Sequence, residues 1–386
     1  MDETIHNIMR IQDNKTINLF INIDGAPLGK STQKCLWPIL CSDDILKEVD
    51  VVGIYYGEEK PSDSNKFLEP FIDEVILLIN EGIDFNNFNY KIRIKGFICD
   101  APAKAYILMV KSHNGYDSCT KCCMHGIYFK NTICFPGFCD ILRIDEMFEN
   151  FNYNLDYQNE KTKLINIPYL ELVSNVPLDY MHLVCLGVMR KLIQLWLSRL
   201  IKKHVRLLSN IIREISDALT DLVKFIPSDF SRKPRALKYL KYWKATELRL
   251  FLLYLGPLVL RKRLSKDVYN HFLELHVAIT ILTSPVLSFN DVNVSYAEQL
   301  LNHFVSSFET LYGNKYISHN VHNLQHIAAD VRKYGALDEF STFRFENFIA
   351  MLIKLVKKGE KPLQQISRRL KEYELTSQIK KNFLKI

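Results

Sequence analysis

The chain has 386 residues, 48% of them hydrophobic and 12% aromatic, so it can build a sizeable core in two or three domains, or in one domain with a large insertion. This composition excludes an intrinsically disordered chain. No apolar run reaches the roughly 18 residues of a membrane span, and the N-terminal MDETIHNIMRIQDN has acids where a signal peptide needs an apolar stretch. We therefore expect a soluble protein that is not secreted and has no membrane partner. The formal charge of +7 permits binding to a polyanion without requiring it.

The chain contains nine cysteines. In a protein that is not secreted, these are expected to be reduced thiols or metal ligands rather than a disulfide framework.

The first hundred residues have the pattern of a sheet. Residues 17–24 alternate in character, which predicts a strand with Asp24 at its end, closed by Gly25 and Pro27. Further strands are predicted at 35–41, 49–56 and 90–99, and the last runs into Asp100. A helix is predicted over 66–80, with Gly82 as its stop. Strands, a helix and a further strand in this order suggest an α/β sheet layer.

From Pro177 onward the periodicity is helical. The predicted helices are 179–201, 205–224, 243–260, 265–283, 295–312, 319–334 and 342–358. Gly313, Gly335 and Gly359 each follow a helical run, where a left-handed cap is favoured. The segment between Asp100 and Pro177 is a cysteine-rich loop followed by a polar stretch.

Two acids end predicted strands. If the strands of Asp24 and Asp100 are neighbours, their carboxylates meet at one sheet edge. Magnesium prefers such oxygen ligands. Two metals about 4 Å apart can stabilise the attacking and leaving oxygens of a phosphoryl transfer. Either aspartate could instead be a solvated turn residue.

A third acid, Glu346, lies early in the predicted helix 342–358, beside its apolar stripe. From that position it could lean toward a sheet edge. It could also be an N-terminal acid favoured by the helix dipole. Asp338 and Glu339 are competitors in the preceding loop.

The motif Cys119-x-x-Cys122 is half of a tetrahedral zinc site. His322 and His326 could supply the other half, because residues four apart share one helix face. His319 is a rival for His322. A local site that uses nearby side chains is an alternative, and these side chains are Cys123, His125, Cys134 and Cys139.

Asp179 and His182 stand three apart at the start of the predicted helix 179–201. They could contact a phosphate or a metal-bound water. Alternatively, Asp179 caps the helix and His182 is a half-buried histidine.

A basic stretch follows, with aromatic residues between the bases. Its bases are Arg232, Lys233, Arg235, Lys238, Lys241 and Lys244, and its aromatics are Tyr239, Tyr242 and Trp243. The combination suits contact with a DNA backbone and stacking on bases. An ordinary charged helix surface has the same appearance.

The order and spacing of these signals resemble those of the RNase H-like transposases of the CACTA and Transib type. They are also similar to those of the catalytic subunit of the recombinase that rearranges antigen-receptor genes. Between about residues 17 and 358 several strings are similar to animal CACTA-like transposases. These strings are INIDGAPLGKSTQKCLWPIL, FICDAPAKAYILMVKSHNGYDSCTKC, VPLDYMHLVCLGVMRKL, RKPRALKYLKYWKATELRLFLLYLGPLVL and VHNLQHIAADVRKYGALDEFSTFRFENF.

The resemblance implies an α/β RNase H-like core with a large, mainly helical, zinc-bound insertion between the second Asp and the Glu. The implied division is a core over 1–112, an insertion over 113–335 and a C-terminal core helix over 336–386. It assigns catalytic Mg²⁺ or Mn²⁺ to Asp24, Asp100 and Glu346. It assigns structural Zn²⁺ to Cys119, Cys122, His322 and His326, and an active-site role to His182.

The resemblance implies a nuclear enzyme that cleaves and joins DNA strands by two-metal-ion catalysis, with DNA as partner and a homodimer in a synaptic complex. The enzyme would be cytoplasmic when it is not bound to DNA. Family members carry an N-terminal segment that recognises transposon ends, whereas here the first predicted strand begins by residue 17, so the chain looks truncated or domesticated. The alternative function is a non-catalytic, zinc-stapled module that binds DNA, chromatin or protein.

Overall fold

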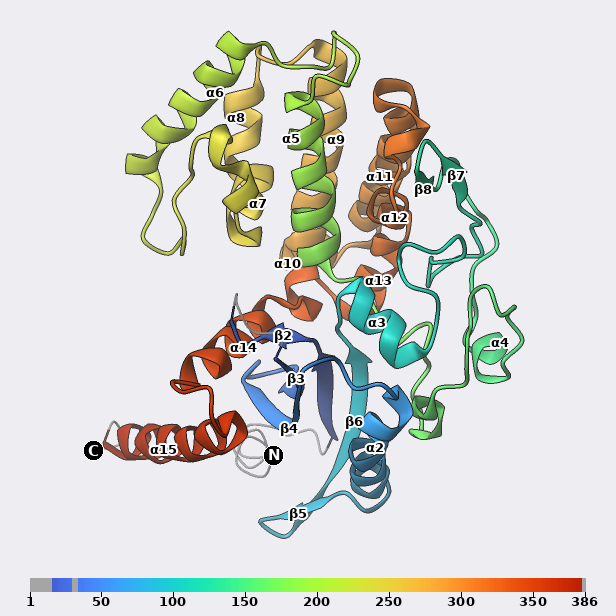
Figure 1. Ribbon diagram of the computed structural model, residues 1–386, viewed down its shortest axis with the longest axis vertical. Coiled ribbons are helices and arrows are strands. Elements are labelled where there is room, and N and C mark those ends of the chain that lie inside the picture. Colours follow the sequence, from blue (N-terminus) through green and yellow to red (C-terminus); the bar gives the residue numbers. More distant parts are fainter. Residues whose placement is uncertain (1–15, 30–33, 384–386) are drawn as a thin grey trace. The chain divides into compact units, whose positions relative to one another are not determined.

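The computed structural model describes residues 16–29 and 34–383 and shows a mixed α/β chain with a curled sheet and many helices (Figure 1). The chain forms two units. The first contains the described residues up to Cys99, Thr162–Leu170 and the residues from Thr342 onward, and the second contains Asp100–Lys161 and Glu171–Ser341. No helix in the described ranges has the combination of length and hydropathy that crossing a bilayer requires.

The first unit is built on a six-stranded sheet with the order β2-β3-β1-β6-β5, in which β4 also pairs with β3. The strands are β1 (Thr16–Ile23), β2 (Ala26–Pro27), β3 (Cys35–Asp43), β4 (Val49–Gly57), β5 (Ile83–Phe85) and β6 (Phe88–Phe97). Strands β1, β3 and β4 form an antiparallel series, whereas β6 lies parallel to β1 with Ile21 opposite Phe97. The predicted strands at 17–24, 35–41, 49–56 and 90–99 are therefore confirmed to within a few residues.

Strand β1 is more deeply buried than alternation suggests. Its inward-facing isoleucines are buried as predicted, but Phe20 and Asn22, on the other face, are each only 1% exposed. A strand covered on both faces is expected in the middle of a sheet that helices cover on each side. The alternation of β1 thus reports side-chain polarity and not solvent exposure.

The helices of the first unit are α2 (Ser64–Glu81), the 3₁₀ turn η1 (Lys163–Asn166), α14 (Phe343–Leu355) and α15 (Pro362–Phe383). Asp63 caps α2 by accepting a 3.1 Å bond from the Lys66 N–H, and Gly82 ends the helix at a φ of 78°, as predicted. Helix α2 packs against β4 and β6, and α14 contacts β4. Gly359 is not a cap, because α14 already ends at Leu355.

The second unit is mainly helical. Its elements before residue 230 are α3 (Ala101–Leu108), β7 (Ile127–Phe129), β8 (Thr132–Cys134), α4 (Asp145–Glu149), η2 (Met181–Met189), α5 (Arg190–Leu197), α6 (Ser209–Asp221) and η3 (Leu222–Phe225). Those after it are η4 (Leu237–Tyr242), α7 (Ala245–Leu250), η5 (Phe251–Leu255), α8 (Gly256–Leu260), α9 (Lys266–Thr283), α10 (Pro285–Ser288), α11 (Asp291–Tyr312), η6 (Asn314–Tyr316), α12 (His319–Asn323), η7 (Leu324–His326), α13 (Ile327–Tyr334) and η8 (Leu337–Phe340).

Four of the predicted helices are not continuous α-helices. The segment 205–224 becomes helical only at Ser209, where α6 begins, and ends in the 3₁₀ turn η3. The segment 179–201 is a π-helix, η2, followed by α5, which ends at Leu197. The segment 243–260 contains a second π-helical stretch, η5, just before Pro257, which lacks the N–H that a regular helix would need there. The segment 319–334 is interrupted by the 3₁₀ turn η7. Hydrophobic periodicity detects a helical run but does not register an inserted residue or a tightened turn.

Candidate metal centre

Two cysteines and two histidines from distant parts of the chain meet in the second unit. Cys119 and Cys122 lie in the loop between α3 and β7, His322 lies in α12, and His326 ends η7. All four side chains are buried, and their ligand atoms lie within 4.8 Å of one another. The grouping expected from the sequence is therefore confirmed, and this group could hold a metal ion such as zinc.

The distances within the group match a tetrahedral site. The two sulfurs are 3.6 Å apart, and Cys122 Sγ lies 3.3 Å from His322 Nε2. With Zn–S near 2.3 Å and Zn–N near 2.0–2.1 Å, tetrahedral geometry requires separations of about 3.8 Å and about 3.6 Å. A disulfide would bring the sulfurs to about 2.05 Å, and both cysteines are free thiols.

An orphaned ring nitrogen gives a second indication that the residues fit a metal. His326 Nε2 is buried and has no hydrogen-bond partner in the described part of the chain. Burying a polar atom without a partner is unfavourable, so such atoms usually have one. A metal ion on His326 would satisfy this nitrogen.

The pKa values of the two thiols are shifted in opposite directions. Burial alone would raise the pKa of Cys119, but the neighbouring side chains of Cys122, His322 and His326 lower that pKa well below its ordinary value. Its hydrogen bond to Cys119 raises the pKa of Cys122, and burial raises it further. Loss of the Cys119 proton is therefore favoured over loss of the Cys122 proton, and a thiolate is the form that binds zinc.

Neighbouring groups hold the ligands in place. The Lys121 N–H donates to Cys119 Sγ at 3.4 Å, and Arg143 Nε donates to the Cys119 carbonyl at 2.9 Å. The guanidinium of Arg143 also lies 3.3 Å from the ring centre of Tyr157. His322 Nδ1 lies 3.2 Å from the side-chain amide of Gln325, so that His322 Nε2 is the nitrogen turned toward Cys122. Such outer contacts fix the orientation of metal ligands.

The break between α12 and α13 does not separate the two histidines. Their rings are 5.3 Å apart at 71°, although the predicted spacing assumed one continuous helix. The 3₁₀ turn η7 carries the chain from His322 to His326 and leaves both rings facing the cysteines.

The alternative ligands are engaged elsewhere. His319 Nδ1 lies 3.0 Å from Ser118 Oγ, and His125 Nδ1 lies 3.0 Å from Asp117 Oδ1. Cys134 Sγ and Cys139 Sγ contact the carbonyls of Ile127 and Ile141, at 3.4 and 3.6 Å. Within each of the two units, over residues 16–29 and 34–383, no other group of three or more His, Cys, Asp or Glu side chains is gathered closely enough to hold a metal.

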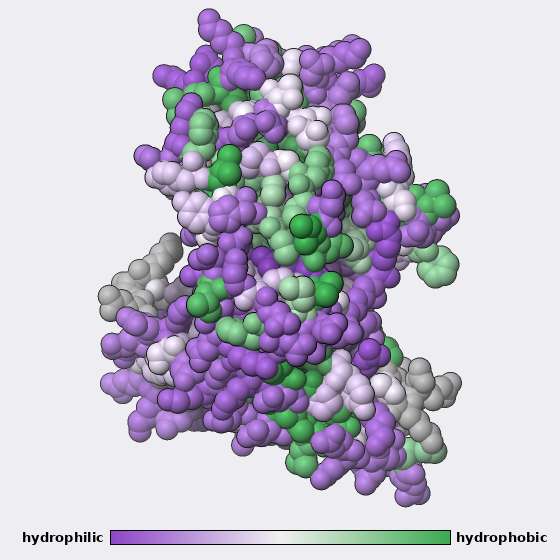
Figure 2. Space-filling model, turned by 90° about the vertical axis from the view of Figure 1, so that its right-hand side faces the viewer, coloured by the Kyte–Doolittle hydropathy of each residue, from purple (hydrophilic) through white to green (hydrophobic). Residues whose placement is uncertain are grey.

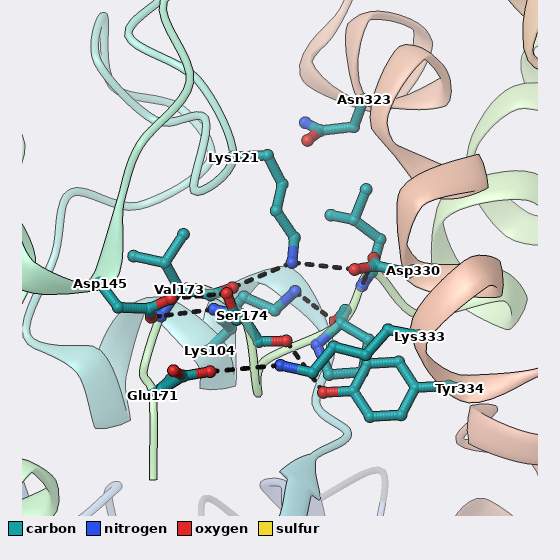
Figure 3. Close-up of polar contacts among 12 residues, drawn as sticks. Lys104, Lys121, Asp145, Glu171, Val173, Ser174, Asn323, Asp330, Lys333 and Tyr334 are labelled. Carbon is teal, nitrogen blue, oxygen red and sulfur yellow. Dashed lines mark hydrogen bonds and ion pairs between the residues drawn. The ribbon is translucent and has the colours of Figure 1, made fainter.

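A buried polar network joins the cysteine loop to α13 (Figure 3). Lys121 Nζ donates to the Val173 carbonyl and to Asp330 Oδ1, both at 3.0 Å. The other oxygen of Asp330 accepts from the N–H of Leu178 at 2.7 Å, and Lys104 Nζ donates to the carbonyl of Pro177 at 2.7 Å. The segment that leads into Asp179 is thereby hydrogen-bonded to α3 through Lys104 and to α13 through Asp330.

The same network is anchored further out by Asp145. Its Oδ1 accepts from the N–H groups of Val173 and Ser174, at 2.6 and 3.0 Å, and its Oδ2 accepts from Ser174 Oγ. The hydroxyl of Tyr334, in α13, donates to the Ser174 carbonyl at 2.9 Å. The sequence analysis did not select these residues, because single charged or hydroxyl side chains in loops carry no periodic signal.

Asp179 and His182 form a close pair. Asp179 Oδ2 lies 2.7 Å from His182 Nδ1 and also accepts from the His182 N–H at 2.9 Å. The Asp179 side chain is buried, and that of His182 is 28% exposed. Asp179 therefore accepts from N–H groups at the start of the helical segment and orients the imidazole, whereas contact of the pair with a phosphate or a metal-bound water stays a prediction.

A glycine that the sequence analysis passed over permits close packing beside the metal centre. A Cβ on Gly187, in η2, would lie 2.4 Å from Asn320 Nδ2 and 2.9 Å from the His182 carbonyl. Helix α12, which carries His322, contacts η2. Only the absence of a side chain at Gly187 allows this approach.

The three acids are positioned by different elements. Asp24 follows β1 directly and its carboxylate accepts from the Gly25 N–H at 2.7 Å. Asp100 is the N-cap of α3 and accepts from the Ala103 N–H at 2.7 Å. Glu346 lies half-buried in the first turn of α14, beside the buried Phe345. Their convergence on one metal pair stays a prediction, because Asp100 begins the second unit while the other two acids belong to the first.

The ends of β1 and β6 are linked within the first unit. The Ile98 N–H donates to the Ile21 carbonyl at 2.8 Å, and the buried Asn22 side chain donates to the Ile98 carbonyl at 2.7 Å. Because β1 and β6 are parallel, the chain leaves both strands at the same sheet edge, toward Asp24 and Asp100.

The basic stretch is divided between bound and exposed side chains. Arg235 forms an ion pair with the buried Glu247 at 2.6 Å, and Lys233 Nζ donates to the carbonyls of Ile226 and Pro227. Trp243 is 2% exposed, so its ring is not available to stack on a base. Lys233 is exposed although its ammonium is bound, and the other exposed bases are Arg232, Lys238, Lys241 and Lys244.

A scan against protein-family models found no match, and a search of curated proteins found none either.

Proposed function

We propose that the chain is the catalytic core of a DNA transposase with an RNase H-like first unit and a zinc-bound helical insertion. The observation that carries the proposal is the parallel pairing of β1 and β6. Because the two strands are parallel, the chain leaves both of them at the same end of the sheet, toward Asp24 after β1 and toward Asp100 after β6. The hydrogen bond from Asn22 to the Ile98 carbonyl links the two strand ends.

The donor set suits hard divalent cations. Carboxylate oxygens are the ligands that Mg²⁺ and Mn²⁺ prefer, and no thiol or imidazole is included among the three acids. Once bound between Asp24, Asp100 and Glu346, the metals would activate a water or a 3′-hydroxyl and neutralise charge on the phosphate. In this proposal the three carboxylates would hold the metals, and no covalent protein intermediate is required.

His182 supplies a further polar group in this proposal. Asp179 holds its Nδ1, so a proton on that nitrogen is retained and the ring keeps one orientation. An imidazole fixed in this way could contact a phosphate oxygen or a water molecule without losing side-chain entropy on binding.

The zinc centre has a structural role in the proposal. A metal on Cys119, Cys122, His322 and His326 would fasten the loop after α3 to α12 and α13, and the Lys121–Asp330 network would extend that fastening to the segment before Asp179. DNA is the proposed partner, with Arg232, Lys238, Lys241 and Lys244 on its backbone. Arg235 and Lys233 contribute less, because their side chains already bind protein groups. A nuclear homodimer in a synaptic complex is part of the same proposal.

The test is nicking of a supercoiled plasmid by the full chain with Mg²⁺ or Mn²⁺. We expect nicking that requires the divalent metal and disappears in Asp100→Asn, because asparagine still caps α3 but lacks the charge that holds the metal. The matched control is Asp73→Asn, an exposed aspartate in α2, which should leave nicking intact. Metal-dependent nicking that survives Asp100→Asn would overturn the assignment.

A second function is favoured by one observation. The Cys/His group is complete without any of the three acids, so the second unit can be zinc-stapled whether or not the chain cleaves DNA. A non-catalytic module that binds DNA, chromatin or protein is therefore the alternative. A wild-type chain that retains zinc and nicks no DNA with either metal would support it.

A further inference from the structure

Two turns of the second unit are rich in bases and contain no acid. They are the α5–α6 turn (198–208) and the α8–α9 turn (261–266). Their bases are Arg199, Lys202, Lys203, Arg206, Arg261, Lys262, Arg263 and Lys266. The metal centre and the 232–244 stretch use none of these side chains.

The two turns lie at the same end of the helical unit (Figure 1). Helix α6, which follows the first turn, contacts α8, which precedes the second, and Arg263 forms a 3.4 Å ion pair with Glu214 of α6. The first turn is also fixed to its neighbours. The Leu207 N–H donates to the Trp196 carbonyl, and Lys202 Nζ donates to the Thr310 carbonyl, both at 2.8 Å.

Buried apolar side chains hold the turns in shape. Val205 and Leu207 anchor the first turn and Leu264 anchors the second, each less than a tenth exposed. The bases between these anchors remain outside, and Figure 2 shows mainly hydrophilic side chains at the upper end of the view. The two turns thus present charge from a fixed backbone, not from a flexible tail.

Most of these charges are not neutralised by the protein. Among the eight bases, only Arg263 forms an ion pair with an acid in the described part of the chain. Six are exposed, and Arg206 and Arg263 are half-buried. Like charges that are gathered without partners raise the local positive potential and attract a polyanion.

We propose that these two turns form a surface that binds the phosphate backbone of duplex DNA, separate from the metal centre. A duplex presents one charge per about 1.7 Å of its axis, so it can engage bases spread over two turns without a pocket. A single bound phosphate would instead need convergent donors. A lipid surface would need a larger set of apolar side chains to insert, and in the two turns only Leu200 and Leu208 are exposed apolar residues, both in the first turn.

The test compares two double variants of the full chain. Lys203→Ala/Lys262→Ala removes one exposed base from each turn. Lys130→Ala/Lys224→Ala removes two exposed lysines elsewhere in the second unit, with the same change in net charge. Binding to a random-sequence duplex is measured by fluorescence anisotropy over a series of salt concentrations, without added divalent metal, so the outcome does not depend on catalysis.

The slope of log Kobs against log[salt] is negative. We expect its magnitude to decrease by about two in the turn variant and to stay unchanged in the control. Equal slopes in the two variants would overturn the proposal. So would a turn variant that loses binding to phosphatidylserine vesicles while its DNA binding is unchanged, since the surface would then serve a membrane. An inactive enzyme that still shows the expected slopes would refute the proposed catalysis and leave this surface intact.

Discussion

Lys121, between the two cysteines of the metal centre, forms a 3.0 Å ion pair with Asp330, four residues beyond His326. Both side chains are nearly buried, at 11% and 6% exposure. Asp330 also accepts from the Leu178 N–H, so one carboxylate joins three segments of the second unit. The pair therefore links the cysteine loop to the helix that follows His326, although neither residue is one of the four candidate ligands.

Asp330→Ala should destabilise the chain by about 3–5 kcal/mol, because it leaves the ammonium of Lys121 buried without its partner. The measurement is urea unfolding of the zinc-loaded protein. Asp291→Ala is the matched control, since that aspartate pairs with Arg332 but is 74% exposed, and its loss should cost about 0–1 kcal/mol. An equal decrease in the free energy of unfolding in the two variants would show that the buried ion pair stabilises the chain no more than the exposed one.

Cys119→Ser should lower the zinc content and the melting temperature together, because a structural zinc contributes folding free energy. Zinc is measured by mass spectrometry after dialysis, and melting by circular dichroism. Cys139→Ser is the control, because Cys139 lies outside the group of four. An unchanged zinc content in Cys119→Ser would exclude this ligand set.

His271 should make stability depend on pH. Burial lowers its pKa to about 4, while its Nε2 donates to the Phe304 carbonyl and its ring stacks on Phe304. The unfolded chain, with a pKa near 6.5, binds the proton more tightly. The contribution to stability is therefore complete above about pH 6.5 and is lost progressively as pH falls toward 4, by about 2–3 kcal/mol.

The measurement for His271 is the free energy of unfolding in urea between pH 4 and 7. His271→Phe should flatten the fall that the wild-type chain shows. His204→Phe is the control, because His204 is exposed in the α5–α6 turn, and its profile should follow the wild type. A His271→Phe profile as steep as the wild type would place the acid sensitivity elsewhere.

Gly187→Ala should weaken the metal centre from a distance. The new Cβ would meet Asn320 and the His182 carbonyl, and relieving this overlap should cost about 1–3 kcal/mol. We expect lower zinc affinity, measured by competition with a chelator, because α12 must shift. Gly53→Ala is the control, since nothing lies within 4 Å of a Cβ there. Unaltered affinity in Gly187→Ala would mean that α12 tolerates the methyl group.

The sequence predicted the parts of the fold that follow a repeating pattern. Alternation located β1, and helical spacing with Gly82 as its stop located α2. The spacing of Cys119 with Cys122 and of His322 with His326 made them candidate ligands but left alternatives open, and the family resemblance selected the four that meet in the structure. Zinc as the occupant stays a prediction.

Long-range polar contacts could not be predicted in the same way. Lys121 and Asp330 are 209 residues apart, and neither position has a local pattern that names its partner. The burial of Trp243 and the π-helix η2 also depend on the surrounding helices and not on nearby residues. Periodicity reports which side of an element is apolar, whereas packing decides what that side meets.

The separation of Cys122 from His322 by 200 positions sets an order of events during synthesis. At about 5–20 residues per second, a ribosome needs about 10–40 s to add the histidines after the cysteines have been made. Through that interval the nascent chain carries two neighbouring thiols without their nitrogen partners, open to oxidation or to a softer metal such as Cu(I). If zinc is the occupant, its loading would be favoured by a reducing environment and a low supply of free copper while α5 to α11 are being translated.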